Sequence, residues 1–394
     1  MRFPEFSGEW EMSSIGEQFE LYSGNTPSRM NKNQFDGSIN WITSGELKEH
    51  YISDTKEKIS EEAAKNNSLK LLPVGTFVIA IYGLEANGVR GTCSITTRES
   101  TISQACMAFT SKMDIQNEFL YSWYKKHGNI IGIKYAQGTK QQNLSYDIIE
   151  RFNISYPCME EQKKLIRFIS LIDQRIATQN KIIEKLQSLI KGLNDNIHKG
   201  IKGETVCFSD LGEAYSGLSG KGGDDFGYGE PFITYMNVYQ NTYISEKDYE
   251  LVQIAPNEKQ NSVQYGDALF TLSSETPEEV GIGAVYLGNT QKLYLNSFCF
   301  GIHFYDERVL PQYLAHFISS SSFRRAIYPL AQGSTRFNLQ KNDFMKMKFL
   351  LPSLEKQGHI ANTLDALHCR LANEKSLTEQ YILLKKYLLS LMFI

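Results

Sequence analysis

Two stretches of the chain carry a similar hydrophobic pattern, and each predicts one long helix. In the first stretch, residues 159–197, large aliphatic side chains recur at alternating steps of three and four. In the second, which starts near residue 354, leucines and one tyrosine recur at similar steps. This spacing produces the narrow apolar seam of a coiled coil, and such a seam needs another helix against it. We therefore expect each helix to be the partner of the other.

The seam of the first helix is expected at Ile169, Ile172, Ile176, Ile183, Leu186, Ile190, Leu193 and Ile197. The seam of the second is expected at Leu364, Leu367, Leu371, Leu377, Tyr381, Leu384, Leu388 and Leu391. One polar residue interrupts each seam, Gln179 in the first and Glu374 in the second. These two residues either occupy tolerated polar positions or fix the register of the pair. Roughly 38 residues, each rising about 1.5 Å, make the first helix a rod of roughly 57 Å.

The helices belong to an internal repeat with an offset of 195 residues. At this offset the Ala-Gln-Gly triplet at 136–138 meets the one at 331–333, and Gln162 meets Gln357. The register holds without a gap from the triplet to the end of each helix, whereas the loops before it differ freely. A shared scaffold with unlike loops indicates two units that do the same kind of work on different targets.

Short β-type runs and turn-rich loops fill the sequence before each helix, which indicates an α+β fold. We predict a first globular domain at residues 1–157 and a first long helix at 158–199. A second globular domain follows at 200–351 and a second long helix at 352–394. Because a whole domain lies between the helices, the chain order fits an antiparallel pair related by a pseudo-two-fold axis.

Composition is compatible with two ordinary hydrophobic cores. The chain has 394 residues, of which 41% are hydrophobic and 12% aromatic. No run approaches eighteen apolar residues, and residues 1–10 lack a signal-peptide pattern, so we expect a cytoplasmic protein with no membrane partner. Six cysteines without a CxxC pair indicate reduced thiols and no zinc site. The net charge of −3 means that any DNA contact must come from local clusters or from partner subunits.

Catalytic motifs are missing. The sequence has no GxxxxGK[ST], HExxH or GxSxG pattern, and it lacks the Asp/Asn-Pro-Pro-aromatic tetrapeptide of amino-methyltransferases. The charged runs at 248–250 and 306–308 could be drawn as a metal-binding nuclease pair, but runs of this kind usually face solvent. We therefore expect a non-catalytic chain with no metal site.

Motifs along essentially the whole chain resemble the specificity subunit of type I restriction–modification systems. They are Arg2–Phe6, Trp10-Glu11, Ser23–Ser28, Ile39–Thr43, Gln137-Gly138-Thr139, Pro157, Glu160–Lys163, Phe270–Gly281, Asn296–Phe298 and the tail from Pro352. The resemblance implies two target-recognition domains, each of which reads half of a split, asymmetric site in double-stranded DNA. It implies that the paired helices hold the domains a fixed distance apart and bind two modification (methyltransferase) subunits. Restriction subunits would complete the assembly, and S-adenosylmethionine, ATP and Mg would belong to the partners, with no cofactor in this chain.

Base reading needs polar side chains that reach the edges of the bases, and the loops supply them. The candidates are Thr43, Ser44, Arg90, Lys140, Gln141, Gln142, Tyr235, Asn237, Ser273, Ser274, Thr276, Arg325 and Arg336. Each is equally compatible with a solvated or turn-capping role. Lys140 and Arg336 lie in the repeated loop before each final strand and helix, and we expect them to contact phosphates rather than bases.

Two other functions remain open from the residues alone. A coiled-coil scaffold that binds proteins and no DNA would show the same duplication with unlike loops. A self-contained nuclease or methyltransferase would need a catalytic constellation that the sequence does not contain. Salt-dependent DNA binding separates the specificity subunit from the scaffold.

Overall fold

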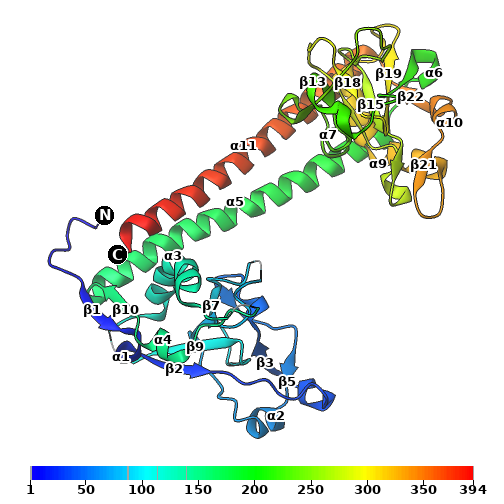
Figure 1. The fold of residues 1–394 in the computed structure, drawn as a ribbon. Coiled ribbons are helices and arrows are strands. Elements are labelled where there is room, and N and C mark those ends of the chain that lie inside the picture. Colours follow the sequence, from blue (N-terminus) through cyan, green and yellow to red (C-terminus); the bar gives the residue numbers. More distant parts are fainter. Residues whose placement is uncertain (1, 87, 113, 139, 394) are drawn as a thin grey trace. The chain divides into compact units, whose positions relative to one another are not determined.

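The computed structural model describes residues 2–86, 88–112, 114–138 and 140–393, so Thr139 of the motif named above lies outside the described residues. The chain divides into two compact units (Figure 1). Unit 1 contains residues 1–179 and 377–394, and unit 2 contains residues 180–376. Each unit therefore combines one globular domain with part of helix α5 (Met159–Lys199) and part of helix α11 (Leu354–Met392).

Unit 1 is built on a five-stranded sheet of order β2-β9-β6-β7-β4, a three-stranded sheet of order β5-β3-β8 and the pair β1-β10. The strands are β1 (Glu11–Ser14), β2 (Phe19–Ser23), β3 (Ile39–Ile42), β4 (Tyr51–Ile52), β5 (Lys58–Ile59), β6 (Phe77–Ala80), β7 (Cys93–Thr96), β8 (Ser100–Ile102), β9 (Cys106–Ser111) and β10 (Asn153–Tyr156). The helices that complete the domain are α1 (Ile15–Gln18), α2 (Glu61–Asn66), α3 (Asn117–Tyr135) and α4 (Tyr146–Glu150).

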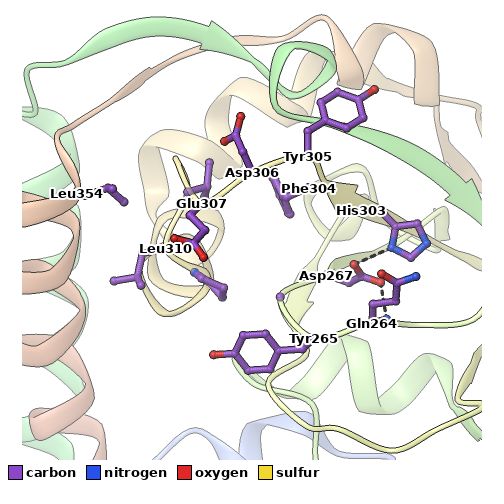
Figure 2. Close-up of a pocket in the computed structure, with 13 residues that line it drawn as sticks. Gln264, Tyr265, Asp267, His303, Phe304, Tyr305, Asp306, Glu307, Leu310 and Leu354 are labelled. Atoms are coloured by element: carbon purple, nitrogen blue, oxygen red, sulfur yellow. Dashed lines mark hydrogen bonds and ion pairs between the residues drawn. The ribbon is translucent and has the colours of Figure 1, made fainter.

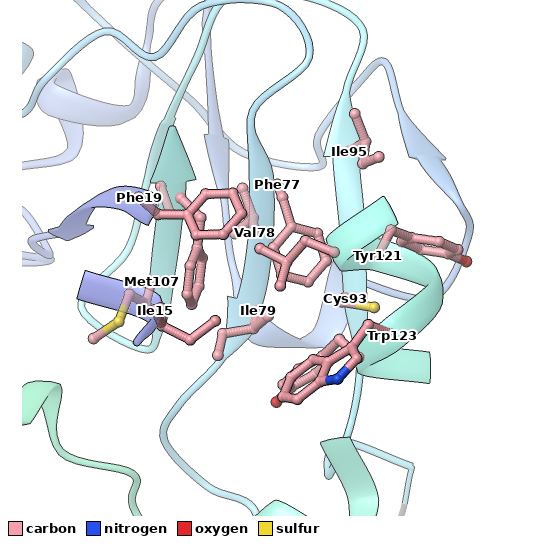
Figure 3. Packing of buried hydrophobic residues seen from close by; sticks show 14 of the residues in the cluster. Ile15, Phe19, Phe77, Val78, Ile79, Cys93, Ile95, Met107, Tyr121 and Trp123 are labelled. Carbon is pink, nitrogen blue, oxygen red and sulfur yellow. The ribbon is translucent and has the colours of Figure 1, made fainter. Parts of the chain in front are cut away.

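The core of unit 1 lies between the large sheet and α3 (Figure 3). Every residue of β6 is buried, as expected for a central strand with a continuous apolar run. Tyr121 and Trp123 of α3 pack on Phe77 and its neighbours. The last turn of α11 joins the same core through the buried Met392. Phe393, the residue after α11, also joins it, and its ring lies 5.2 Å from that of Phe119. The end of the second long helix thus completes the first unit.

Unit 2 repeats this topology. Its four-stranded sheet has the order β12-β19-β15-β17, beside the sheets β14-β13-β18 and β16-β21-β20 and the pair β11-β22. In both units a parallel strand pair, β3-β8 or β13-β18, occupies the equivalent small sheet. The strands are β11 (Glu204–Cys207), β12 (Gly212–Ser216), β13 (Phe226–Ile233), β14 (Tyr249–Val252), β15 (Ala268–Thr271), β16 (Ser273–Ser274), β17 (Gly283–Val285), β18 (Tyr294–Leu295), β19 (Cys299–Phe304), β20 (Ala331–Gln332), β21 (Phe337–Leu339) and β22 (Lys348–Leu351). The helices are α6 (Phe208–Leu211), α7 (Tyr235–Gln240), α8 (Pro311–Ser319), α9 (Ser321–Ile327) and α10 (Lys341–Met345).

The two long helices pair antiparallel, as predicted. Within unit 1, Lys385 Nζ lies 2.5 Å from Asp173 Oδ1, and Arg175 Nε donates to the Tyr381 hydroxyl over 3.3 Å. The contacts therefore run forward along α5 and backward along α11. Predicted seam positions on α5 are buried or half-buried throughout. The α+β class with paired long helices is confirmed.

For α11, the prediction that Leu384 lies in the seam is wrong. The Leu384 side chain is 44% exposed, whereas Leu388 is only 8% exposed. The residues of α11 that face α5 in this part follow steps of three and four through Thr378, Tyr381, Lys385 and Leu388, which puts Leu384 beside the seam. Lys385 occupies the position because its aliphatic stem packs in the seam while its ammonium group reaches Asp173.

Leu384 and Leu388 form a matched pair for a stability test. Replacing Leu388 by alanine removes a buried side chain and should lower the free energy of unfolding by about 2 to 5 kcal/mol. The same change at Leu384 should cost less than about 1 kcal/mol, because its side chain is already largely in water. Urea unfolding of both variants measures the difference. Equal losses would contradict the corrected seam.

Unit 2 holds a buried polar network where α8 meets the long helices. The Tyr243 hydroxyl and His316 Nε2 both lie 2.7 Å from Asp365 Oδ1. Burial lowers the pKa of His316 despite the neighbouring carboxylate, and burial also lowers the pKa of His198 and His368. The three imidazoles therefore favour the neutral form in the folded chain.

This network predicts a pH-dependent stability. An unfolded histidine takes up a proton near pH 6.5, whereas the buried His198 and His316 and the half-buried His368 do so only at lower pH. As pH falls below about 6.5 the unfolded state binds more protons, so the free energy of unfolding should fall. Thermal unfolding of the full chain at about pH 7.5 and about pH 5.5 measures this loss. His316→Gln should reduce it, and the exposed His359→Gln serves as the control that should not. Identical losses in both variants would exclude the network as the cause.

Candidate nucleic-acid interface

Two loops that are distant in the sequence form one surface in unit 1. They are loop 83–91, which follows β6, and loop 137–143, which precedes α4. Leu84 N–H donates to the Gln142 carbonyl over 3.0 Å, and Gln142 N–H donates to Glu85 Oε2 over 2.7 Å. Loop 83–91 and loop 137–143, which we name the unit 1 loop pair, are therefore held together by one backbone–backbone and one backbone–side-chain hydrogen bond.

Arg90 connects the two loops to each other and contacts helix α3. Its Nη2 donates to Gln142 Oε1 over 2.7 Å, so two of the predicted DNA-contacting residues bind each other. The Arg90 side chain also crosses α3 at Gly132, where an added Cβ would lie 2.5 Å from Arg90 Cγ. Arg90 is half-buried and stabilises the loop pair. Lys140 and Gln141 lie at the exposed tip of the same surface.

Unit 2 joins the equivalent loops in the same way. Residues 272–281 follow β15, residues 333–338 precede α10, and β16 pairs with β21 between them. Leu339 N–H donates to the Leu272 carbonyl over 2.8 Å, matching the 2.9 Å bond from Leu144 N–H to the Ile81 carbonyl in unit 1. These segments are the unit 2 loop pair.

A glycine with positive φ makes each loop pair possible. Gly138 has φ +114° and Gly333 has φ +140°, values that residues with a side chain rarely adopt. A Cβ at Gly138 would lie 2.0 Å from the Gln141 carbonyl oxygen, and one at Gly333 would lie 1.9 Å from that of Arg336. Both glycines belong to the Ala-Gln-Gly triplet, so the repeated motif has a structural cause.

The unit 2 loop pair borders a pocket of about 360 Å³, here called the recognition pocket. It brings together four of the predicted residues, Tyr235, Ser273, Ser274 and Arg336. Its other lining residues are Met236, Tyr239, Glu275, Glu279 and Phe298. The pocket therefore combines aromatic, apolar, acidic and basic groups within one concave surface.

Hydrogen bonds fix the aromatic wall of the recognition pocket. The Tyr235 hydroxyl donates to the Ser273 carbonyl over 2.8 Å, and the Tyr239 hydroxyl donates to Glu279 Oε1 over 2.6 Å. The bond to Glu279 raises the pKa of Tyr239, so its hydroxyl stays protonated and keeps donating. The two tyrosine rings are stacked with their centroids 6.0 Å apart. Both tyrosine side chains are therefore held in place by hydrogen bonds within the chain.

Three predicted residues have structural roles instead. Asn237 is 2% exposed, and its amide donates to the Ser245 carbonyl and accepts from Ser245 N–H, so DNA cannot reach it. Thr43 uses its hydroxyl and its N–H on the Glu46 carboxylate at a helix start. Ser274 is buried and donates to the Thr276 carbonyl. A polar residue in a loop often caps local backbone, and the sequence does not show which ones do.

The remaining predicted residues are accessible but do not all gather at one place. Thr276 is exposed at the edge of the unit 2 loop pair. Arg325 is exposed on α9 and does not line the recognition pocket. Ser44 is half-buried next to Thr43.

Two exposed apolar residues of the recognition pocket are not among the predicted residues. Met236 is 48% exposed and Phe298 is 55% exposed, and both line the recognition pocket. Their signal in the sequence is weak: an aromatic residue directly after the polar Asn296-Ser297, and a methionine at the start of a short helix. Only the tertiary structure places them beside Arg336.

A larger pocket of about 590 Å³ in unit 2 is lined by acidic side chains, which would repel a phosphate group (Figure 2). Asp306 and Glu307 line it together with Tyr265, Tyr305 and the buried Asp267. Asp306 pairs with Arg308, whose backbone N–H bond is the main reason for the lowered pKa of this carboxyl group. Among the described residues no group of three or more His, Cys, Asp or Glu side chains could hold a metal ion.

Comparison with known proteins points to one family. The model of the type I restriction modification DNA specificity domain matches residues 7–188 and again residues 203–380. The MjaIX specificity subunit of a type I restriction enzyme from Methanocaldococcus jannaschii is 29% identical over 185 residues, which cover 45% of this chain and 42% of that relative. The MjaVIII specificity subunit from the same organism is 21% identical over 419 residues, covering 100% and 93%. A crystal structure of the type I restriction–modification S subunit from M. genitalium matches with a TM-score of 0.54 at 12% identity, covering 100% and 99%.

Proposed function

Because this chain belongs to the family of type I restriction modification DNA specificity domains, we propose that it selects the DNA sequence for a type I restriction–modification enzyme. Each unit reads one half of a bipartite, asymmetric site through its loop pair. The chain itself catalyses no step. Its role is to hold two base-reading surfaces on one continuous polypeptide in the cytoplasm, where the host's DNA is.

The observation that carries this proposal is the duplicated loop pair. Both units share an equivalent backbone bond, donated by Leu144 or Leu339, and a positive-φ glycine. The side chains differ, since Gln141 in the first loop pair aligns with Arg336 in the second. A conserved frame with different side chains is what reading two unlike half-sites requires. If both units bound the same target, the two loop pairs would be expected to carry the same side chains.

The long helices supply a surface for protein partners. Leu383, Leu384 and Tyr387 of α11 are exposed large apolar side chains on the part of the helix that belongs to unit 1. Exposed apolar side chains on a paired helix favour contact with another protein. Two modification subunits fit this role, and restriction subunits would complete the assembly. S-adenosylmethionine, ATP and Mg would bind to those partners. No helix in the described part of the chain is long and apolar enough to cross a membrane.

Base-resolved methylome sequencing tests the proposal. A host that expresses this chain with its neighbouring modification subunit should gain one methylated motif, made of two unlike blocks separated by a fixed, unspecified gap. If the complex assembles and no such motif appears, the coiled-coil scaffold becomes the better description. The exposed apolar side chains of α11 are compatible with that alternative.

A further inference from the structure

We propose that the recognition pocket of unit 2 reads a thymine methyl group next to a G·C base pair, with Met236 and Phe298 on the methyl group and Arg336 on the guanine. This inference rests on the proposed function and adds which bases one unit selects. It follows from the chemistry of four accessible side chains in the same pocket: Met236, Phe298, Arg336 and Glu275.

The apolar pair matches the one apolar mark that DNA offers in its major groove. Thymine presents a C5 methyl group there, and proteins recognise it by apolar contact. Met236 and Phe298 keep about half of their surface in water, which costs free energy unless a ligand covers them. Phe298 is held in place because its N–H donates to Asn296 Oδ1 over 2.9 Å.

Arg336 differs from a phosphate-binding arginine in its surroundings. Two carboxylates, Glu275 and Glu279, line the same pocket and repel a phosphate group. In the described part of the chain no hydrogen bond or ion pair engages the Arg336 side chain, so its donors remain free for a ligand. Arginine binds the O6 and N7 atoms of guanine in a bidentate manner. The sequence alone favoured a phosphate contact here, and the two carboxylates favour a base edge.

Glu275 completes the pattern. Its side chain is exposed at the pocket, whereas Glu279 is occupied by the Tyr239 hydroxyl. A free carboxylate in the major groove accepts from the N4 amino group of cytosine. Arg336 and Glu275 therefore match the two bases of one G·C pair, and the apolar pair matches the neighbouring thymine.

Base analogues in duplex DNA test the inference one atom group at a time. The assembled complex is titrated with duplexes that carry the mapped site, in which each thymine of both half-sites is replaced in turn by uracil, which lacks only the methyl group. One uracil should weaken binding by about fourfold, the value of one buried methyl group. In the Met236→Ala/Phe298→Ala double variant the same uracil should cause no further loss. Leu251→Ala removes an exposed apolar side chain of unit 2 outside the pocket, and this control should respond to uracil as the unchanged protein does.

The guanine contact has its own readout. Replacing the neighbouring guanine by 7-deazaguanine should weaken binding by about tenfold in the unchanged protein and not in Arg336→Ala. Lys346→Ala, which removes another exposed positive charge of unit 2, should leave this tenfold difference intact.

The outcomes separate the two proposals. Absence of a bipartite motif for the assembled wild type would reject the proposed function. A bipartite motif would overturn the methyl-reading pocket, while the function stands, if no thymine in the half-site of unit 2 responded to uracil or if every such response persisted in the double variant. The half-site of unit 2 is the one that Gly333→Ala disturbs. A half-site of unit 2 that contains no thymine in either strand would overturn it as well.

Discussion

Insertion of four residues into both long helices, within 178–185 of α5 and 373–380 of α11, is expected to lengthen the gap between the two half-sites and leave both half-sites unchanged. Each insertion adds one helical turn, about 6 Å, which equals the rise of roughly two base pairs. The helices contribute to both units, so their length is the natural determinant of the gap. Methylome sequencing of the variant reads the gap directly.

Both helices must be changed together, because an insertion in one alone moves the two apolar seams out of register. Insertion of four residues directly before Gly223, which is exposed at the start of a short 3-10 helix of unit 2, is the control and should not alter the gap. A variant whose half-sites change while the gap stays constant would show that the helices do not act as a spacer.

Gly333→Ala should abolish recognition of one half-site and leave the other unchanged. The added Cβ would lie 1.9 Å from the Arg336 carbonyl oxygen, so the unit 2 loop pair must shift and carry Arg336 with it. Positive φ adds strain of about 1 to 3 kcal/mol. The measurement is methylation of both half-sites together with the thermal stability of the chain.

Two controls make this result specific. Gly223→Ala adds a Cβ in open space within the same unit and should be neutral. Gly138→Ala produces the equivalent clash in unit 1 and should affect the opposite half-site. If both glycine variants damaged the same half-site, the assignment of one half-site to each unit would be wrong.

Much of the architecture could be predicted because it depends on periodicity. A three- and four-residue spacing can bury an apolar seam only as a helix against a helix, and the 195-residue offset requires two copies of whatever the first copy forms. The structure confirms the α+β class, the antiparallel pairing and the repeated sheet order. The Ala-Gln-Gly triplet also predicted that the two units share a loop, and its glycine adopts positive φ in both.

The sequence by itself therefore determined the repeat, the two long helices and the position of the loop that contains each Ala-Gln-Gly triplet. Only the tertiary structure decided which side chains occupy the helix seam and the recognition pocket. Lys385 lies in the seam in place of Leu384, and Asn237 is buried. Met236 and Phe298 line the same pocket as Arg336. The physical reason is that periodicity is a local property of the chain. Whether a polar group is compensated, and which distant residues share a pocket, depends on contacts that form only when the chain has folded.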